Sequence, residues 1–227
     1  LGTAGSLKLL EDKLDKRFMV FYGDVVMDFD INHFVEFDKK HPGSIGTTLV
    51  HPNDHPFDSD LVDVDKNFLV TDIFPKPHAK GQFLKNLVNA AVYIFSNKIF
   101  DFIQKDIMQD FGKDILPLII KSNEKLYAYL THEYIKDMGT KDRLEEVNSD
   151  FRQGKVARLN RQNKRPCIFL DRDGVINKNM DTNPIAENFE LLDGAAEAIK
   201  KINKIDYLAV VVTNQPMIAK GFLGFNE

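Results

Sequence analysis

Apolar and polar residues alternate along the first part of the chain in a pattern that predicts mixed α/β structure. Runs rich in β-branched and aromatic residues, such as FMVFYGD, IGTTLVHP and NAAVYIF, are separated by amphipathic stretches such as INHFVEFDKKHP and SNKIFDFIQKDIM. In INHFVEF, the residues Ile31, Phe34, Val35 and Phe37 recur at helical spacing. The run from Phe18 to Tyr22 is uniformly apolar, which predicts a strand that is buried on both faces.

The pattern changes across residues 152–165, which are rich in lysine and arginine. This composition predicts the end of a helix that runs into a linker. Beyond it, PCIFL, DGAAEAIKKINKI and YLAVVVTNQ predict a strand, a helix and a second strand, the opening of a βαβ unit. We therefore expect a first domain at residues 1–156, a linker at 157–165 and a second domain at 166–227.

The composition narrows the class of protein. Of the 227 residues, 43% are hydrophobic and 28% are charged, which is ordinary for a soluble globular chain. The net charge of -4, without basic clusters among aromatic residues, argues against a nucleic-acid partner. No apolar run approaches the ~20 residues that cross a bilayer, no secretory leader opens the chain, and Cys167 is the only cysteine. We expect a cytoplasmic protein with no membrane partner.

Two aspartates follow the first strand of the second domain. Asp171 and Asp173 in DRDG are two residues apart at the end of an extended run, so both side chains can point the same way, and Gly174 lets the backbone turn. Such an acidic pocket can hold Mg2+. One carboxylate can attack a phosphorus atom while the other transfers protons. The TNQ segment after the next strand is expected at the same sheet edge.

Three segments of the second domain resemble the haloacid dehalogenase-like phosphatases: FLDRDGVIN, FELLDGAAEAI and VVTNQPMIAKG. The resemblance is closest to the branch that acts on heptose bisphosphate and histidinol phosphate. The resemblance implies the N-terminal βαβ part of a Rossmannoid domain, with Asp171 as nucleophile and Asp173 as general acid and base, both ligating Mg2+. It implies that Thr213 and Asn214 contact the phosphoryl oxygens. The family's later lysine, distal acids and Zn2+-binding loop are expected beyond Glu227, and Pro216 and Met217 stand where the family usually has Ser-Gly.

The first domain carries acids at two predicted strand ends, Asp24 in FYGDVV and Asp137 in KDMGT. Two carboxylates from different strand ends can hold Mg2+ against a triphosphate, so we expect them to lie close together. Lys76 lies between two prolines and is expected to be a fixed cation. The Gly2–Gly5 segment has a backbone that can lie against a flat ring or a ribose.

Six segments of the first domain, taken in order, resemble the sugar-1-phosphate nucleotidyltransferases: LGTAGSLK, VFYGDVV, FPKPH, VNAAVYIF, DFGKDILP and KDMGT. A seventh segment, HPNDHPFDSDLVDVD, is most similar to the heptose and mannose guanylyltransferase branch of that family. The resemblance implies the C-terminal part of a Rossmann-like domain, with its triphosphate loop expected before Leu1. It implies that Asp24 and Asp137 ligate Mg2+, that Lys76 binds the sugar phosphate, and that Asn89 binds the sugar hydroxyls. The implied nucleobase contacts are Gly2, Thr3, Ala4 and Gly5.

Together the two resemblances imply a bifunctional sugar-nucleotide enzyme of the α/β class. Its substrates would be GTP and a sugar 1-phosphate, best fitted by heptose, and a sugar bisphosphate for the phosphatase. Two alternatives stay open: a non-catalytic remnant that binds sugar phosphate or a partner chain, and a hexose-specific transferase beside a phosphatase of other specificity. His51 and His55 could bind a metal with Asp54 or Asp58, but the His-Pro steps favour a turn. The oligomeric state is also open.

Overall fold

The computed structural model describes residues 1–53, 55–78, 84–178 and 189–216. The chain falls into two compact units, Leu1–Asn163 and Lys164–Glu227. This division lies within the linker expected at 157–165, and the assignment of the units to two catalytic domains stays a prediction. Within the described ranges, no helix has the length and apolarity needed to cross a bilayer.

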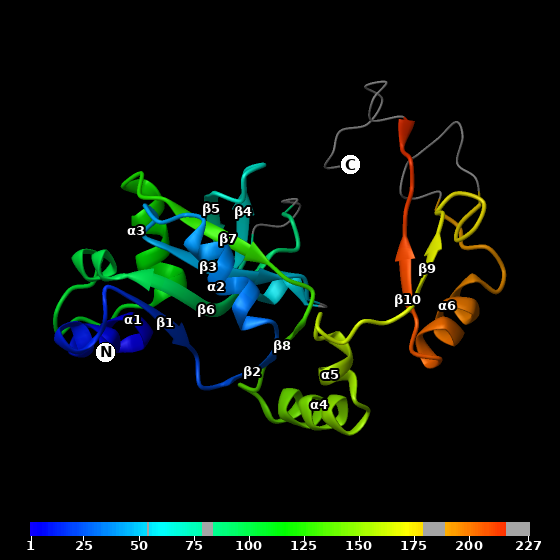
Figure 1. Cartoon of the computed structure of the whole chain (residues 1–227), viewed down its shortest axis with the longest axis horizontal. Helices are drawn as coiled ribbons and strands as arrows, with labels where there is room; N and C mark the ends of the chain where they lie inside the picture. The colour runs from blue at the N-terminus through cyan, green and yellow to red at the C-terminus, as the bar shows by residue number, and fades with distance from the viewer. Residues whose placement is uncertain (54, 79–83, 179–188, 217–227) are drawn as a thin grey trace. The chain divides into compact units, whose positions relative to one another are not determined.

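The first unit is built on a six-stranded mixed sheet (Figure 1). The strand order is β5-β4-β6-β3-β7, and β1 pairs with the carboxyl half of β6. All pairs are antiparallel except β3 with β7. The strands are β1 (Arg17–Phe21), β3 (Gly46–His51), β4 (Leu61–Val64), β5 (Val70–Phe74), β6 (Val88–Ser96) and β7 (Leu126–Leu130). A separate antiparallel pair joins β2 (Val25–Asp28) to β8 (Tyr134–Asp137).

Hydrophobic clusters form on both faces of this sheet. Along β6, Ala90, Val92 and Ile94 pack with helix α2 (Ile31–Lys39), whereas Tyr93 and Phe95 pack with the second cluster. Residues of the second cluster come from α1 (Gly2–Leu7), η3 (Asn97–Phe102), η4 (Phe111–Ile115) and α3 (Leu116–Lys121). Successive side chains of a strand point to opposite faces, so β6 is buried from both sides. The remaining helices of this unit are η1 (Lys8–Lys13), η2 (Pro56–Asp58), α4 (Lys141–Arg152) and α5 (Lys155–Leu159).

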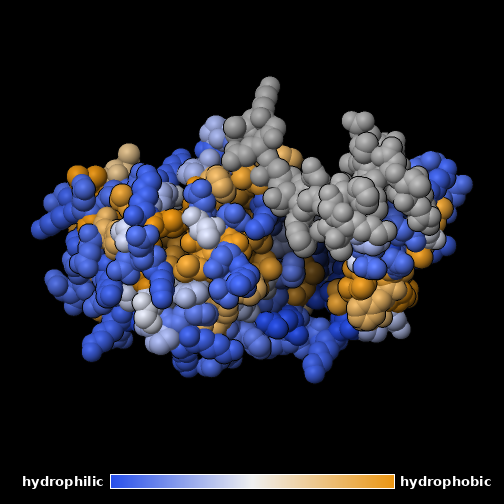
Figure 2. Space-filling model, turned by 90° about the horizontal axis from the view of Figure 1, so that it is seen from above, coloured by the Kyte–Doolittle hydropathy of each residue, from blue (hydrophilic) through white to orange (hydrophobic). Residues whose placement is uncertain are grey.

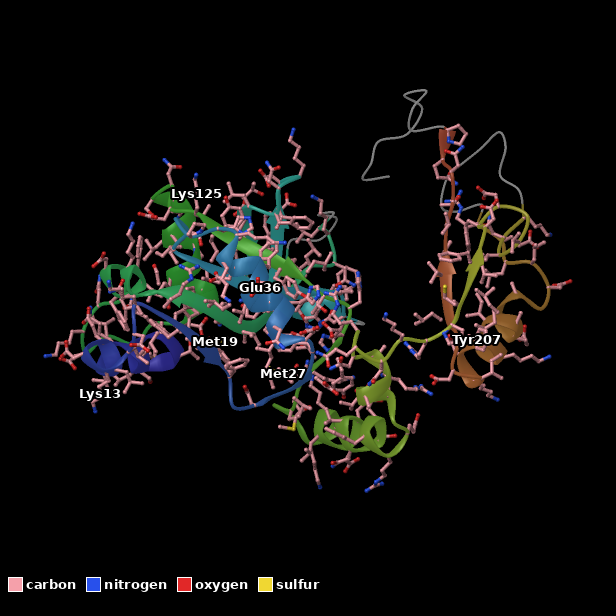
Figure 3. The ribbon with its side chains drawn as sticks, in the orientation of Figure 1. Lys13, Met19, Met27, Glu36, Lys125 and Tyr207 are labelled. Atoms are coloured by element: carbon pink, nitrogen blue, oxygen red, sulfur yellow. The ribbon has the colours of Figure 1, made fainter. Side chains whose placement is uncertain are left out.

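The expected helix at INHFVEF is confirmed as α2, but the expectation that Phe18–Tyr22 is buried on both faces is wrong. In β1, Met19 and Phe21 are 39% and 43% exposed, while Phe18 and Val20 pack against the core (Figure 3 labels Met19). Successive side chains of a strand point to opposite faces. The face of β1 that carries Phe18 and Val20 therefore packs on the core, while the face that carries Met19 and Phe21 is not fully covered.

An ion pair between a half-buried arginine and a buried aspartate joins β1 to α2. The guanidinium of Arg17 donates to both carboxylate oxygens of Asp38 over 2.5 Å, and to the carbonyl and hydroxyl of Ser44. The hydroxyl of Thr47 donates to the same carboxylate over 2.7 Å. Because a buried charge is costly without partners, this bidentate arrangement fixes the helix, the strand and the following loop in one position.

Strand β6 contains a bulge beside β3. Thr48 pairs with Tyr93 and Val50 pairs with Asn89, so β3 advances two residues where β6 advances four. Ala91 lies inside the bulge with a φ of 56°. This is the left-handed region, which costs a residue with a Cβ atom ~1–2 kcal/mol. Bulges re-aim the side chains next to them, and here the affected residue is Asn89.

The second unit has the predicted strand, helix and strand. β9 (Cys167–Leu170) pairs in parallel with β10 (Leu208–Val211), and α6 (Ala195–Lys204) connects them and packs against β10. Cys167 begins the strand, as expected. Phe169, Val211 and Val212 are all more than half exposed, and Figure 2 shows hydrophobic residues on the surface of this unit. That it is a phosphatase domain stays a prediction.

The strain at Ala91 makes a testable prediction. Ala91→Gly should raise the free energy of unfolding by about 0.5–1 kcal/mol, because glycine adopts a positive φ without a Cβ clash. Ala90→Gly is the matched control, since Ala90 is buried in the same strand outside the positive-φ positions. It should lower the free energy of unfolding by about 1 kcal/mol. Urea unfolding of both variants measures the difference, and equal losses would contradict the strain at Ala91.

Candidate active site

Asp24 and Asp137 are brought to neighbouring strand ends by β2 and β8. Asp137 is the last residue of β8 and pairs with Val25, the first residue of β2. The N–H of Met138 donates to the carbonyl oxygen of Asp24 over 2.7 Å. The sequence predicted that the two acids lie close together, and the backbone pairing does place them next to one another. It does so in the small two-stranded sheet rather than in the main sheet, and their role as metal ligands stays a prediction.

Both acids line a cavity of about 600 Å³. Four of the residues predicted from the sequence share this cavity: Asp24, Lys76, Asn89 and Asp137. They come from the position just before β2, from the segment after β5, from β6 and from β8. Other polar residues of the lining are Tyr22, His51, Asn53, His55, Asp58, Ser59, Asp60, His132, Glu133, Tyr134, Lys136, Arg143, Asp150 and Lys155.

Asn89 is held in place by a chain of hydrogen bonds. Its side-chain oxygen accepts from the hydroxyl of Thr48 over 3.1 Å, and its amide nitrogen donates to the hydroxyl of Tyr93 over 2.9 Å. The ring of Tyr93 packs edge-on against the ring of Tyr22, with the centroids 6.2 Å apart. Burial raises the pKa of both tyrosines, so both hydroxyls stay neutral. Asn89 is thus oriented from behind, at the wall of the cavity.

The charged side chains of the cavity form a connected series. The guanidinium of Arg143 donates to Asp137 over 2.6 Å and to Asp58 over 3.3 Å. Lys76 donates to the backbone carbonyl of Asp58 over 3.0 Å and lies 3.5 Å from its carboxylate. Asp137 raises the pKa of Arg143. Arg143 comes from the first turn of α4, whose N-cap is Thr140.

The Gly2–Gly5 segment lies elsewhere in the first unit. It forms the start of α1, and the N–H of Ala4 donates to the carbonyl of Gln109 over 2.9 Å. A Cβ atom on Gly2 or Gly5 would come within 2.5 Å of a backbone carbonyl oxygen, so the glycines permit this close packing. The structure does not bring the segment into the cavity lining. The hydroxyl of Thr3 donates to Asp110 over 2.8 Å and accepts from the N–H of Phe111 over 3.1 Å.

The residues at this site fit Mg2+ better than a histidine-bound metal. In the part of the chain that the structure describes, no three His, Cys, Asp or Glu side chains are grouped to hold a metal by themselves. The ring of His55 interacts with Asn53 and with Ser59, 3.2 Å away, at the start of the η2 turn, as the turn interpretation predicts. Asp54 lies outside the described residues. Mg2+ is usually held by one or two carboxylates plus substrate phosphates, a role that Asp24 and Asp137 suit.

The acid pair of the second unit lies beside the segment after β10. Asp173 accepts from Gln215 over 2.9 Å, and Gln215 donates to the hydroxyl of Thr213 over 2.7 Å. Asp171 directly follows β9, and its side chain accepts from the N–H of Arg172 over 2.7 Å. The carboxyl ends of two parallel strands therefore supply one polar cluster, as expected from the βαβ pattern. Asn214 is exposed between Thr213 and Gln215.

Asp173 is strongly stabilised as a carboxylate. Arg172 contacts both of its oxygens at 3.0 to 3.2 Å, and the side chains of Gln215 and Asn177 also donate to it. These donors, led by Arg172, lower the pKa of Asp173 to about 2. In this arrangement Asp173 stays ionised and is a weak base. To take up a proton and later donate it, Asp173 would first have to lose some of these contacts.

Several residues of both sites were not assigned these positions from the sequence. Arg143 joins the cavity through an ion pair with Asp58, which the sequence suggested only as a possible metal ligand beside the histidines, and Arg172 and Gln215 surround Asp173. Gln215 belongs to the TNQ segment that was expected near the acids, so its position was available from the pattern. Arg143 follows a capping threonine in GTKDR, which predicts the helix start but not the direction of the arginine side chain.

Comparisons with known proteins point to one family. The nucleotidyl transferase family model matches residues 1–154. The mannose-1-phosphate guanyltransferase of Saccharomyces cerevisiae is 29% identical over 170 residues, which cover 73% of this chain and 44% of that protein. The Candida albicans enzyme of the same name is 31% identical over 144 residues, covering 61% of this chain and 38% of that protein. The chain spans about half the length, or less, of these curated relatives.

Solved structures show the same likeness. HddC from Yersinia pseudotuberculosis is 26% identical, with a TM-score of 0.55 over 66% of this chain and 63% of that chain. A structure of HddC complexed with GMP-PN matches over the same shares of the two chains with a TM-score of 0.54. These neighbours confirm the expected nucleotidyltransferase fold of the first unit.

Buried His51 makes stability depend on pH. Burial, helped by the nearby His55, lowers the pKa of His51 to about 4, so the unfolded chain binds more protons than the folded one below pH ~6.5. Stability should therefore fall between pH 6.5 and 4, by up to about 3 kcal/mol from this residue. His51→Gln should flatten that fall in urea unfolding at pH 7, 6 and 5. His33→Gln, on the exposed side of α2, is the control and should leave the slope unchanged.

Proposed function

Because the chain belongs to the nucleotidyl transferase family, we propose that it transfers a guanylyl group from GTP to a sugar 1-phosphate and releases pyrophosphate. The observation that carries the proposal is the single cavity shared by Asp24, Lys76, Asn89 and Asp137. These residues come from four segments that are far apart in the sequence, and they are the ones that the family resemblance assigned to metal, phosphate and sugar. Guanine is favoured because the named relatives are guanyltransferases and HddC was solved with GMP-PN.

In the proposed reaction, the chain acts mainly by positioning and by neutralising charge, which is what phosphoryl-type transfer requires. Mg2+ held by Asp24 and Asp137 would offset the negative charge of the triphosphate. Lys76 binds the phosphate of the sugar 1-phosphate as a cation anchored beside Asp58. Asn89 presents its amide to the sugar hydroxyls, in an orientation set by Thr48 and Tyr93.

The nucleobase contact of Gly2, Thr3, Ala4 and Gly5 belongs to the same proposal. In the structure, this segment packs on the 107–109 backbone, and the hydroxyl of Thr3 donates to Asp110. We propose heptose as the sugar, because HPNDHPFDSDLVDVD is most similar to the heptose and mannose branch. A hexose such as mannose is the alternative that a substrate panel separates.

Asp24→Asn should abolish guanylyl transfer in the purified protein. An amide has no negative charge to hold Mg2+, and loss of such charge stabilisation commonly costs ~10²–10³-fold in rate. Pyrophosphate release from GTP, Mg2+ and heptose 1-phosphate or mannose 1-phosphate measures this. Asp12→Asn, an exposed acid of η1, is the control and should keep the wild-type rate.

Two results would contradict the assignment. Undiminished transfer by Asp24→Asn would remove Asp24 from the site. Binding of sugar phosphate by the wild-type protein without any transfer would instead favour the alternative of a non-catalytic binding protein.

The second unit supports a second proposed activity, a Mg2+-dependent phosphatase that acts on a sugar bisphosphate. The specific observation is that Asp171 directly follows β9, and that Gln215 joins Asp173 to Thr213 after the parallel strand β10. The oxygen of Asp171 would attack phosphorus, and the bond to the leaving sugar oxygen would break, giving an aspartyl-phosphate that water then hydrolyses. Asp173 would move the protons. Such a phosphatase would supply the sugar 1-phosphate that the first unit activates.

Asp171→Asn should abolish phosphatase turnover while leaving guanylyl transfer within about twofold of the wild-type rate, because the amide cannot act as the nucleophile. The measurements are phosphate release from a heptose bisphosphate with Mg2+ and pyrophosphate release from GTP, on the same preparations. Asp193→Asn, an exposed acid of the same unit, is the control. Equal loss of both activities in Asp171→Asn would mean that the two reactions do not use separate sites.

A further inference from the structure

The side chain of Asp58 lies between two cations of the first unit. One of its oxygens is 3.5 Å from the ammonium of Lys76, and the other accepts from the guanidinium of Arg143 over 3.3 Å. The two cations therefore contact opposite oxygens of a single carboxylate. All three side chains line the cavity that holds Asp24 and Asp137.

The two cations are fixed by contacts that do not involve the Asp58 carboxylate. Arg143 donates to Asp137 over 2.6 Å, and its side chain is 25% exposed. Lys76 donates through its ammonium to the backbone carbonyl of Asp58, and through its N–H to Asp60. The Asp58 side chain, in contrast, is 66% exposed. The carboxylate is thus the member of the group that can leave without disturbing the other two.

We propose that Lys76 and Arg143 together bind the phosphate of the sugar 1-phosphate, and that Asp58 occupies the place of that phosphate in the free protein. This inference rests on the proposed guanylyl transfer. A carboxylate and a phosphate both offer paired oxygens to an arginine fork, and the phosphate dianion offers more charge. Because exposed ion pairs contribute little free energy, displacing Asp58 costs little.

The arrangement gives Arg143 a place in the substrate site that its position in the sequence did not reveal. Asp137 holds one edge of the guanidinium, which leaves the edge toward Asp58 for the phosphate. A phosphate bound there would lie next to Asp137, the predicted metal ligand. The contact with Asp58 also makes the empty site self-inhibited, because substrate must displace an internal anion.

Two substitutions test whether Asp58 competes with the substrate phosphate or only positions the two cations. If Asp58 competes, they should change the affinity for mannose 1-phosphate in opposite directions. Asp58→Asn removes the internal competitor and should tighten binding of mannose 1-phosphate, by up to about fivefold. Arg143→Met removes a charged donor and should weaken binding by about 10–100-fold. Arg143→Lys keeps the positive charge but loses the paired N–H donors of the guanidinium. Its affinity should therefore lie between those of Arg143→Met and the wild type.

The measurement is calorimetric titration of the purified protein with mannose 1-phosphate at low ionic strength, with inorganic phosphate as a second probe. Asp63→Asn is the matched control, because Asp63 forms a comparable exposed pair with Lys85 outside the cavity lining. It should leave both affinities unchanged. Titration with GTP in the presence of Mg2+ is run on every variant, as is thermal unfolding.

Weaker phosphate binding in both Asp58→Asn and Arg143→Met would overturn the inference, because Asp58 would then position the cations rather than compete with the substrate. Unchanged affinity in Arg143→Met, or in Arg143→Lys if the methionine variant unfolds, would also overturn it. In both cases normal GTP binding and transfer by the wild-type protein would leave the proposed function standing. A wild-type protein that binds neither GTP nor mannose 1-phosphate would instead refute the proposed function.

Discussion

The bulge in β6 is the constraint on which the first unit depends. This strand supplies apolar side chains to both hydrophobic clusters and pairs with β1, β3 and β4. The two additional residues on β6 change its register with β3 next to the cavity. The same strand that builds the core therefore also lines the cavity, with Asn89, Ala90 and Ala91. Positive φ at Ala91 is the local cost of that change.

Most of the elements were predictable from the sequence because each depends on local patterning. Ile31–Lys39 has helical spacing and an Asp30 cap, and the β9–α6–β10 order follows from two apolar runs around an amphipathic stretch. The exposure of β1 was not predictable, because Met19 and Phe21 are as apolar as their neighbours. What decides their burial is whether another element covers that face, and this information does not lie within the strand.

The site was predictable to the extent that it follows strand ends. Asp24 and Asp137, like Asp171 and Thr213, are placed by backbone pairing, which the alternation of strands and helices specifies. Arg143 and Arg172 are placed by the direction of long side chains, which no spacing rule specifies. The Gly2–Gly5 segment shows a third limit on what the sequence alone can predict. Its small residues permit close approach to a backbone as readily as to a ring, and here the partner is the carbonyl of Gln109.

Both acidic sites carry the same electrostatic feature. Asp137 is paired with Arg143, and Asp173 is paired with Arg172, in each case at a strand end. An arginine in this position keeps the carboxylate ionised and limits its rotation, so the oxygen is already directed when a ligand arrives. In the reactions proposed for these sites, a divalent cation would therefore meet a carboxylate whose charge is partly neutralised. At the first site, the phosphate would bind the edge of the guanidinium that faces Asp58, while Asp137 keeps the other edge.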